Sequence, residues 1–236
     1  MAIKPYHQIP ILDCGEPLVP IPLERFAVEW PHPYEKLGAP YRERSPYYLR
    51  QSVLDSLTEA DNKLQHYNPG WRIQIFDAYR PVEVQQFMVD YTFASVVEAQ
   101  GLNFELPDAQ RQAIWEQVYQ IWAVPSFDLA TPPPHTTGAA VDVTLVDETG
   151  RTVNMGSAID ELSARSHPDY FASATLPREQ QYHAHRQLLR NIMFAAGFRR
   201  HPDEWWHFSQ GDQMWAWLCN QENITHPFTA RYGRAA

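Results

Sequence analysis

Hydrophobic residues recur along the chain at spacings that predict an alternation of helices and strands. Between residues 49 and 64 they fall at steps of three and four positions, which predicts one apolar helical face that ends before Asn68-Pro69-Gly70. Residues 71–78 alternate apolar and polar types instead, which is typical of a strand buried mainly on one face. The chain therefore changes from a helical to a strand period at this turn.

Further elements follow from the same pattern. Pro81 suits the first turn of a helix that runs to about Gln100, and a second helix is predicted over residues 107–122. Residues 140–146 are mostly apolar and rich in β-branched types, so they predict a buried strand that turns at residues 147–150. Strands and helices thus occur throughout the middle of the chain.

The C-terminal third combines a clear helix with an ambiguous aromatic stretch. Residues 178–197 carry apolar side chains on one side, and Gly197 is the stop signal of that helix. The tryptophan-rich stretch predicts two antiparallel strands, 204–209 and 214–218, which turn near Gly211-Asp212. The second of these segments could equally form a short helix.

The N-terminal 46 residues carry many of the 20 prolines. Proline excludes long helices and central strands, so we expect residues 1–46 to form an irregular arm that wraps the core. At 236 residues the chain is long enough for a substantial core, and its composition does not change abruptly. We therefore expect one domain over residues 1–236, with the arm as a candidate lid.

Composition and charge narrow the class of ligand. The net charge of −9 disfavours binding to nucleic acid or to an anionic membrane, because such surfaces need clustered Lys and Arg. A small neutral or cationic ligand fits better. No segment approaches 18 continuous apolar residues and the N-terminus lacks a signal-peptide pattern, so we expect a soluble cytoplasmic protein. Cys14 and Cys219 are expected to be buried reduced thiols, although a disulfide between them remains an alternative.

One charged residue interrupts the apolar strand at 140–146. A carboxylate there, Asp142, is costly unless a cation or hydrogen-bond donors satisfy it. His135 and His207 are the candidate partners, since two imidazoles and one carboxylate leave an open position on a catalytic zinc. Glu204 is the nearby carboxylate that could handle the proton of water. On a regular strand, however, Glu204 and His207 would face opposite ways unless a bulge intervenes.

Each of these signals has a simpler explanation when it is taken alone. A histidine before a glycine turn is more often a turn residue, and tryptophans beside a histidine usually pack in a core. Arg80, at a strand-to-helix junction, could serve only to start the helix. His183 and His185 form a competing pair, but they lie two apart on a predicted helix and so point in different directions, which suits surface or interhelical roles rather than one metal site. The other histidines have no partner spacing, so structural or solvent-exposed roles are expected for His7, His32, His66, His167, His201 and His226.

Three motifs together resemble the signature of the VanX-type D-alanyl-D-alanine dipeptidases, zinc enzymes related to D,D-carboxypeptidases and to the hedgehog fold. The first motif has histidine, glycine and aspartate at His135, Gly138 and Asp142. The second reads Glu204-Trp205-Trp206-His207, and the third reads Asp77-Ala78-Tyr79-Arg80-Pro81. The motifs occur in the family's order and span residues 77–207.

The resemblance implies an α+β fold, in which helices pack against an antiparallel sheet. It implies one zinc ion per chain, bound by His135, Asp142 and His207. Glu204 would be the general base and acid, and Arg80 would stabilise the oxyanion. The expected substrate contacts are Asp160, which would hold the free amine of a dipeptide, together with Tyr79 and Trp205.

The chain departs from the family pattern at two positions. Pro133 stands where the family usually has a serine, two residues before the first zinc histidine, and it removes a hydroxyl and an amide donor. Phe26 stands where a tyrosine is expected beside the substrate amine, and it cannot donate that hydrogen bond. The fine specificity is therefore expected to differ, while the metal chemistry is not.

The resemblance favours zinc-dependent hydrolysis of a small D,D-dipeptide, above all D-Ala-D-Ala. The nearest alternative is a carboxypeptidase or endopeptidase that acts on peptidoglycan. A non-catalytic zinc-binding module is a further alternative, but Glu204 argues against it because a structural zinc needs no base. A non-haem iron oxygenase uses the same ligand types with a shorter histidine–aspartate spacing, and it leaves Arg80 without a task. Nothing in the sequence indicates the oligomeric state.

Overall fold

A five-stranded sheet organises the part of the chain that the computed structural model describes, which is residues 4–222, 225 and 227–235. The strands lie in the order β2 (Ala27–Val28), β4 (Arg72–Asp77), β5 (Ala140–Val146), β7 (His207–Ser209) and β6 (Arg199–Arg200). Three neighbouring pairs are antiparallel, whereas β2 runs parallel to β4 at one edge. The expected α+β fold with a mainly antiparallel sheet is confirmed, and the parallel β2–β4 pair at its edge is a further feature.

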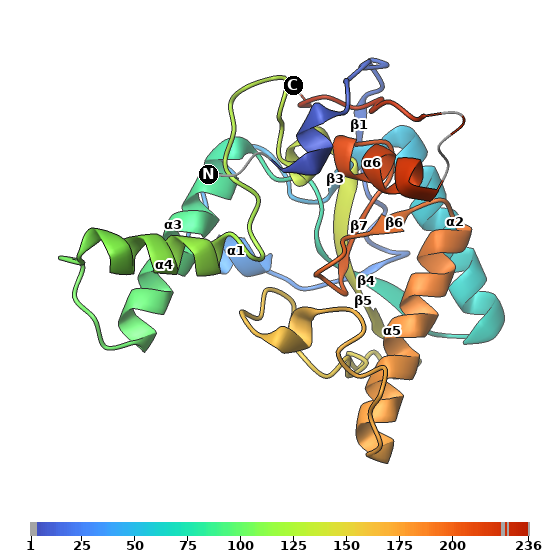
Figure 1. Cartoon of the computed structure of the whole chain (residues 1–236). Coiled ribbons are helices and arrows are strands. Elements are labelled where there is room, and N and C mark those ends of the chain that lie inside the picture. Colours follow the sequence, from blue (N-terminus) through green and yellow to red (C-terminus); the bar gives the residue numbers. More distant parts are fainter. Residues whose placement is uncertain (1–3, 223–224, 226, 236) are drawn as a thin grey trace.

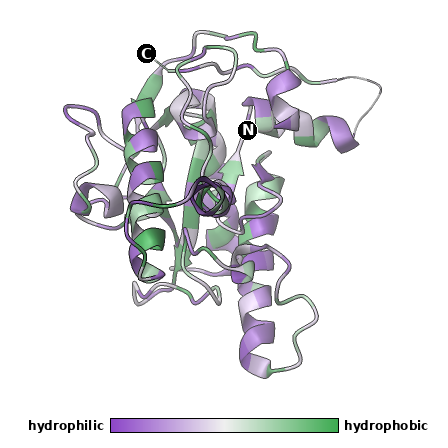
Figure 2. Ribbon diagram, turned by 60° about the vertical axis from the view of Figure 1, so that its left-hand side comes forward, coloured by the Kyte–Doolittle hydropathy of each residue, from purple (hydrophilic) through white to green (hydrophobic). Residues whose placement is uncertain are grey.

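Two long helices, α2 (Gln51–Tyr67) and α5 (Pro177–Ala195), lie side by side against one face of this sheet (Figure 1). Their apolar faces and the sheet enclose the main hydrophobic core. Full burial of a side chain such as Leu57 or Ile192 is worth about 1.5–3 kcal/mol. In Figure 2 the central strands are coloured as hydrophobic, while the helices around them carry both hydrophilic and hydrophobic residues.

The remaining elements surround this centre. Helices α3 (Val82–Ala99) and α4 (Asp108–Val118) share a second hydrophobic cluster and project away from the sheet (Figure 1). A small second sheet pairs β1 (Leu18–Pro20) with β3 (Tyr48–Arg50). The short elements are η1 (Pro5–Gln8), α1 (Pro33–Lys36), η2 (Pro134–Thr137), η3 (Ala164–Ser166) and α6 (Gln213–Glu222).

Strand β5 is buried along its whole length because both of its faces are covered. Its odd-numbered residues, among them Val141 and Val143, belong to the core beneath α2 and α5. Successive side chains of a strand point to opposite faces, so Asp142 and Thr144 lie on the other face. An aspartate can therefore sit in the middle of an apolar strand without entering the hydrophobic core.

An irregularity in the pairing of β4 with β5 changes which residues face Asp142. The register shifts between Ile75 and Asp77, so that Asp77 lies opposite Asp142. An extra residue of this kind redirects the side chains that follow it. The shift puts Asp77 on the face of the sheet that carries Asp142, rather than on the core face with Ile75.

The proline-rich arm contains only short elements, as expected, although β2 joins the edge of the main sheet. The strand expected over residues 204–209 is wrong in extent, because β7 begins at His207. Residues 214–218 are helical rather than extended, within α6. The physical reason is Asp212, whose carboxylate accepts a 2.7 Å hydrogen bond from the Trp215 backbone amide and so caps the first turn of the helix.

Two smaller expectations can also be compared with the structure. Both cysteines are free, but Cys14 is exposed and only Cys219 is buried, which corrects the expectation that both are buried. Among the described residues, none of the helices has the length and apolar character needed to cross a membrane.

We expect Gly138→Ala to lower the free energy of unfolding by about 2–4 kcal/mol. Gly138 has a φ of 71°, and a β-carbon there would lie 2.2 Å from Leu18 Cδ2. Gly15 has a similar φ of 70° with open space around it, so Gly15→Ala should cost only about 1 kcal/mol and is the matched control. Urea unfolding of both variants measures the difference. An equal loss of unfolding free energy in both variants would mean that the close contact with Leu18 does not destabilise Gly138→Ala.

Candidate metal centre

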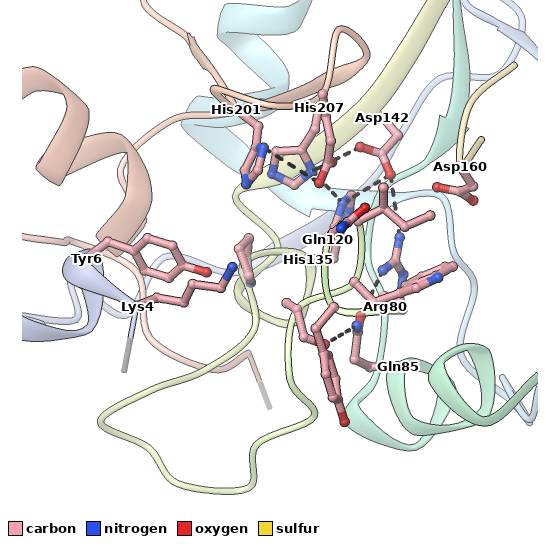
Figure 3. A pocket seen from close by; sticks show the side chains of 16 residues that line it. Lys4, Tyr6, Arg80, Gln85, Gln120, His135, Asp142, Asp160, His201 and His207 are labelled. Atoms are coloured by element: carbon pink, nitrogen blue, oxygen red, sulfur yellow. Dashed lines mark hydrogen bonds and ion pairs between the residues drawn. The ribbon is translucent and has the colours of Figure 1, made fainter. Parts of the chain in front are cut away.

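Three buried side chains converge on the face of β5 that lies away from the α2 and α5 core (Figure 3). The His135 Nε2 atom lies 3.1 Å from His207 Nδ1 and 3.2 Å from an Asp142 carboxylate oxygen. His207 Nδ1 lies 3.0 Å from the other Asp142 oxygen. The structure thus brings together the three ligands expected from the sequence.

The backbone explains why these residues meet. Asp142 and His207 are directly opposite each other in the β5–β7 pair, and such cross-strand neighbours have β-carbons about 4.5–5.5 Å apart. His135 lies in η2, and the left-handed Gly138 then turns the chain into β5. The His135 Nδ1 atom lies 2.7 Å from the Ala78 carbonyl oxygen, which accepts its proton and leaves Nε2 free to bind a metal.

The arrangement fits a tetrahedral metal. Four ligands at about 2.0–2.1 Å from zinc lie about 3.3 Å from one another. The two imidazole nitrogens are 3.1 Å apart, and each lies 3.0–3.2 Å from one of the two Asp142 carboxylate oxygens, so the separations are similar. Burial opposes ionisation of Asp142, but the imidazoles of His135 and His207 hold the pKa of its carboxyl below the usual range. Burial lowers the pKa of His207 and so favours the neutral form that binds a metal. Two imidazoles and one carboxylate leave an open position on the metal.

Glu204 lies beside this triad. One of its carboxylate oxygens is 3.9 Å from His207 Nδ1, and the other is 3.6 Å from His201 Nδ1. Because Glu204 precedes β7, strand alternation does not turn it away from His207, which removes the difficulty raised by the sequence. Burial, with the charges of Asp142 and Asp160, raises the pKa of Glu204 well above its usual range. A buried carboxyl with a raised pKa is typical of a general acid or base.

Arg80 is held rigidly at the strand-to-helix junction before α3. Its guanidinium donates to Asp77 through Nε at 2.9 Å, and its Nη2 lies 2.7 Å from the same carboxylate oxygen. Nη1 donates to Gln85 Oε1 at 2.8 Å, and Nη2 lies 3.4 Å from Asp142. The ring of Trp122 stacks 4.9 Å from the guanidinium carbon. Arg80 therefore presents a fixed positive charge beside the triad.

Asp160 lies at the end of the same cavity, as Figure 3 shows. Its backbone adopts a φ of 61°, a left-handed conformation that is uncommon outside glycine and is often found at functional sites. Burial, together with the neighbouring Asp142 charge, raises the pKa of Asp160 to about 7. Its carboxylate accepts a 2.7 Å hydrogen bond from the Tyr34 hydroxyl.

Tyr34 is a residue that the sequence interpretation missed. Phe26, which stands where the tyrosine was expected, is buried in the main core, and Tyr34 from α1 supplies a hydroxyl instead. Two histidines for which structural or solvent-exposed roles were expected lie at or beside the site. His201 lines the cavity, and His32 lies 3.2 Å from Asp77, the carboxylate that holds Arg80. His226 lies outside the described residues.

Two expected substrate contacts do not line the cavity. Tyr79 is buried, and its hydroxyl accepts a 2.8 Å hydrogen bond from Arg44. Trp205 donates through Nε1 to Ser157 at 2.9 Å and stacks on Arg186. Both side chains are engaged elsewhere, so the structure does not bring them to the site. The cavity is lined by Lys4, Tyr6, Arg80, Gln85, Tyr119, Gln120, Ile121, Trp122, Ala123, Pro134, His135, Asp142, Asp160, His201, Glu204 and His207.

Comparison with known proteins identifies the family of this chain. The peptidase M15 profile, described as D-ala-D-ala dipeptidase, matches residues 28–228. A D-alanyl-D-alanine dipeptidase of Synechocystis sp. is 54% identical over 239 residues, which cover 98% of this chain and 97% of that protein. One of Escherichia coli is 34% identical over 117 residues, which cover 48% of this chain and 58% of that protein.

Among solved structures, a mutant of the vancomycin-resistance D,D-pentapeptidase VanY in complex with Zn(II) has a TM-score of 0.45 and 19% identity, covering 75% of this chain and 80% of that one. The profile covers most of the chain, and the Synechocystis relative aligns along nearly all of it. The chain therefore belongs to the D-ala-D-ala dipeptidase family, peptidase M15, and is a peptidase.

Proposed function

We propose that this peptidase hydrolyses D-Ala-D-Ala with one zinc ion bound by His135, Asp142 and His207. The observation that carries the proposal is the convergence of these three side chains, whose neighbouring nitrogen and oxygen atoms lie 3.0–3.2 Å apart, in a cavity that Glu204 and Arg80 also line. The relative that aligns over nearly the whole chain is a D-alanyl-D-alanine dipeptidase, which supports the same substrate.

Glu204 and Arg80 each have a task in peptide hydrolysis beside the metal. A bound zinc ion would polarise the scissile carbonyl and lower the pKa of a water molecule to about 7. Glu204 takes the proton of the attacking water and delivers it to the leaving amine, and its raised pKa suits that exchange. Arg80 meets the negative charge that grows on the carbonyl oxygen. That interaction is stronger in the transition state than in the ground state, so it accelerates the reaction.

The amine end of the substrate is assigned to Asp160 and Tyr34. A carboxylate in a closed cavity attracts the ammonium of a dipeptide, and binding of that cation would favour the ionised form of Asp160. The Tyr34 hydroxyl donates to Asp160 and so orients its carboxylate.

We expect Arg80→Ala to keep its zinc and to lose about 10²–10³-fold in kcat, the loss typical of a removed oxyanion donor. The metal is retained because Arg80 is not among the proposed ligands. Metal analysis and D-Ala release are measured on the same samples, with Arg178→Ala, an exposed arginine at the start of α5, as the control.

Removal of Arg80 also leaves the buried Asp77 carboxylate without its main partner, which can cost about 3–5 kcal/mol of stability. Arg80→Lys keeps a positive charge there, and unfolding curves identify any variant that is not folded. A folded Arg80→Ala variant with the kcat of the wild type would mean that Arg80 serves only the start of α3.

A comparison of substrates tests the proposed function. Zinc-loaded protein is incubated with D-Ala-D-Ala, with L-Ala-L-Ala, and with an N-acylated peptide that ends in D-Ala-D-Ala. The proposal expects rapid cleavage of the free D,D-dipeptide and little cleavage of the other two. Preference for the N-acylated peptide would identify a D,D-carboxypeptidase instead, because such an enzyme does not need a free amine beside Asp160.

A further inference from the structure

Two side chains from the N-terminal segment reach the end of the cavity that lies away from Asp160. Figure 3 shows the Lys4 ammonium and the Tyr6 hydroxyl next to each other, approaching the metal ligands from one side, with Asp160 on the opposite side. His135, Asp142 and His207 lie between the two ends in that view. The cavity thus carries an acidic group at one end and a basic group at the other.

Neither polar group is committed to another contact. Within the described chain, Lys4 Nζ forms no ion pair with a carboxylate, and the Tyr6 hydroxyl has no hydrogen-bond partner, although Tyr6 is largely buried. Most other polar side chains of the cavity are engaged: Arg80 binds Asp77, Gln85 binds the Ala123 carbonyl, and Asp160 binds Tyr34. An uncommitted ammonium and phenol in such a cavity are suited to bind an anionic group.

The segment that carries these groups is held in place by the C-terminal part of the chain. Element η1 packs against α6, and Gln213 of α6 donates a 2.7 Å hydrogen bond to the Ile9 carbonyl. The Ala230 backbone amide donates to the Pro10 carbonyl at 3.0 Å. Lys4 and Tyr6 are thereby positioned in advance, which reduces the entropy lost when a ligand binds.

We infer that Lys4 and Tyr6 bind the C-terminal carboxylate of the dipeptide and make the enzyme specific for a free carboxylate. The inference rests on the proposed function. A dipeptide is a zwitterion whose ammonium and carboxylate flank a single peptide bond. Asp160 at one end, the triad in the middle and the Lys4–Tyr6 pair at the other end match that order of groups.

Lys4 also limits the length of the substrate. A second, outer pocket adjoins the cavity, and Lys4, Tyr119, Gln120 and Ile121 line both of them. Lys4 therefore stands at the boundary between the inner cavity and the outer pocket. A residue added after the second D-alanine would have to pass Lys4, and it would remove the carboxylate from the Lys4–Tyr6 pair.

The test compares D-Ala-D-Ala with its C-terminal amide on the zinc-loaded full chain. Lys4→Met removes the charge and keeps a side chain of similar length, and Tyr6→Phe removes only the hydroxyl. Lys63→Met, on α2 and far from the cavity, is the matched control. We expect Lys4→Met to lose about 10–100-fold in kcat/KM for the free acid, mainly through a higher KM. A hydrogen bond to a charged group typically contributes a factor of about that size to binding.

The amide should change little, so that the preference of the wild type for the free acid disappears in Lys4→Met. Tyr6→Phe should also lose kcat/KM for the free acid but not for the amide, by a smaller factor than Lys4→Met. Binding provides a second readout: in a Glu204→Ala background the dipeptide is not consumed, and Lys4→Met should weaken its Kd by about the same factor of 10–100.

The outcomes separate this inference from the proposed function. A wild type that cleaves neither compound overturns the dipeptidase proposal and this inference with it. A second outcome is a wild type that is active while Lys4→Met and Tyr6→Phe lose equal factors in kcat/KM for the free acid and the amide, or lose nothing. That result overturns only the assignment of Lys4 and Tyr6 to the carboxylate. Unchanged Kd values in the Glu204→Ala background would contradict it in the same way.

Discussion

Replacement of Glu204 by alanine is expected to lower kcat by about 10³–10⁴-fold, the upper part of the range for a lost general acid and base. The protein should still bind zinc, because Glu204 lies outside the three proposed ligands and its carboxylate is 3.9 Å from His207 Nδ1. Glu204→Asp should also lose most activity. A carboxylate withdrawn by roughly 1 Å no longer reaches the same proton positions, and misplacement on that scale can cost about a hundredfold.

D-Ala release and zinc content are measured on the same samples. Asp203→Ala is the matched control. Asp203 is the exposed neighbour of Glu204, so its replacement removes a carboxylate from the same segment. A Glu204→Ala variant that keeps more than about a tenth of the turnover would exclude Glu204 as the base. Loss of zinc in that variant would make Glu204 a ligand instead.

The second large effect is expected from the metal ligands themselves. His135→Ala, Asp142→Ala and His207→Ala should each lose the bound zinc and with it nearly all activity, because a site with three protein ligands has none to spare. His66→Ala, an exposed histidine of α2, should bind about one zinc per chain, as the wild type does. Metal analysis after dialysis against a weak chelator measures the zinc content of the ligand variants and of the His66→Ala control.

Circular dichroism separates loss of metal from loss of fold. This matters most for Asp142→Ala, which also removes a partner of Arg80. A folded variant of His135, Asp142 or His207 that keeps stoichiometric zinc would remove that residue from the ligand set.

The sequence was sufficient where local pattern and motif spacing agree. The helix expected from residue 49 and the strand over 140–146 correspond to α2 and β5, and the family resemblance drawn from the three motifs is confirmed. Asp142, a carboxylate within an apolar strand, indicated that a cation or hydrogen-bond donors must lie next to it. The structure supplies partners in the residue paired opposite to it, His207, and in the turn that precedes the strand.

The aromatic stretch after residue 204 was harder to interpret. Its alternating and helical spacings are similar, so the sequence favours two strands there but leaves a short helix open for residues 214–218. The signal that could have decided is Asp212, an N-cap residue directly before the helical segment. The short extent of β7 also lets Glu204 and His207 lie in one cavity, which no count of alternating positions could predict.

Other contacts depend on chain segments that are distant in sequence. Tyr34 lies 126 residues before Asp160, and the hydrogen bond between them requires the folded arm. Lys4 and Tyr6 enter the cavity because η1 packs against α6 at the opposite end of the chain. Such pairings arise from tertiary packing, so a single sequence carries no periodic or spacing signal for them. The arm, expected to be irregular, contributes Lys4 and Tyr6 to the cavity, and its Tyr34 donates a hydrogen bond to Asp160 at the other end.

The most direct test of the zinc dipeptidase is to remove and restore the metal while D-Ala-D-Ala hydrolysis is followed. The purified chain is stripped with a chelator and titrated with zinc, and the rate of D-Ala release is plotted against zinc bound per chain. We predict no hydrolysis by the stripped protein and a linear recovery that saturates at about one zinc per chain. Full activity in the stripped protein, or saturation without hydrolysis of D-Ala-D-Ala, would contradict this prediction.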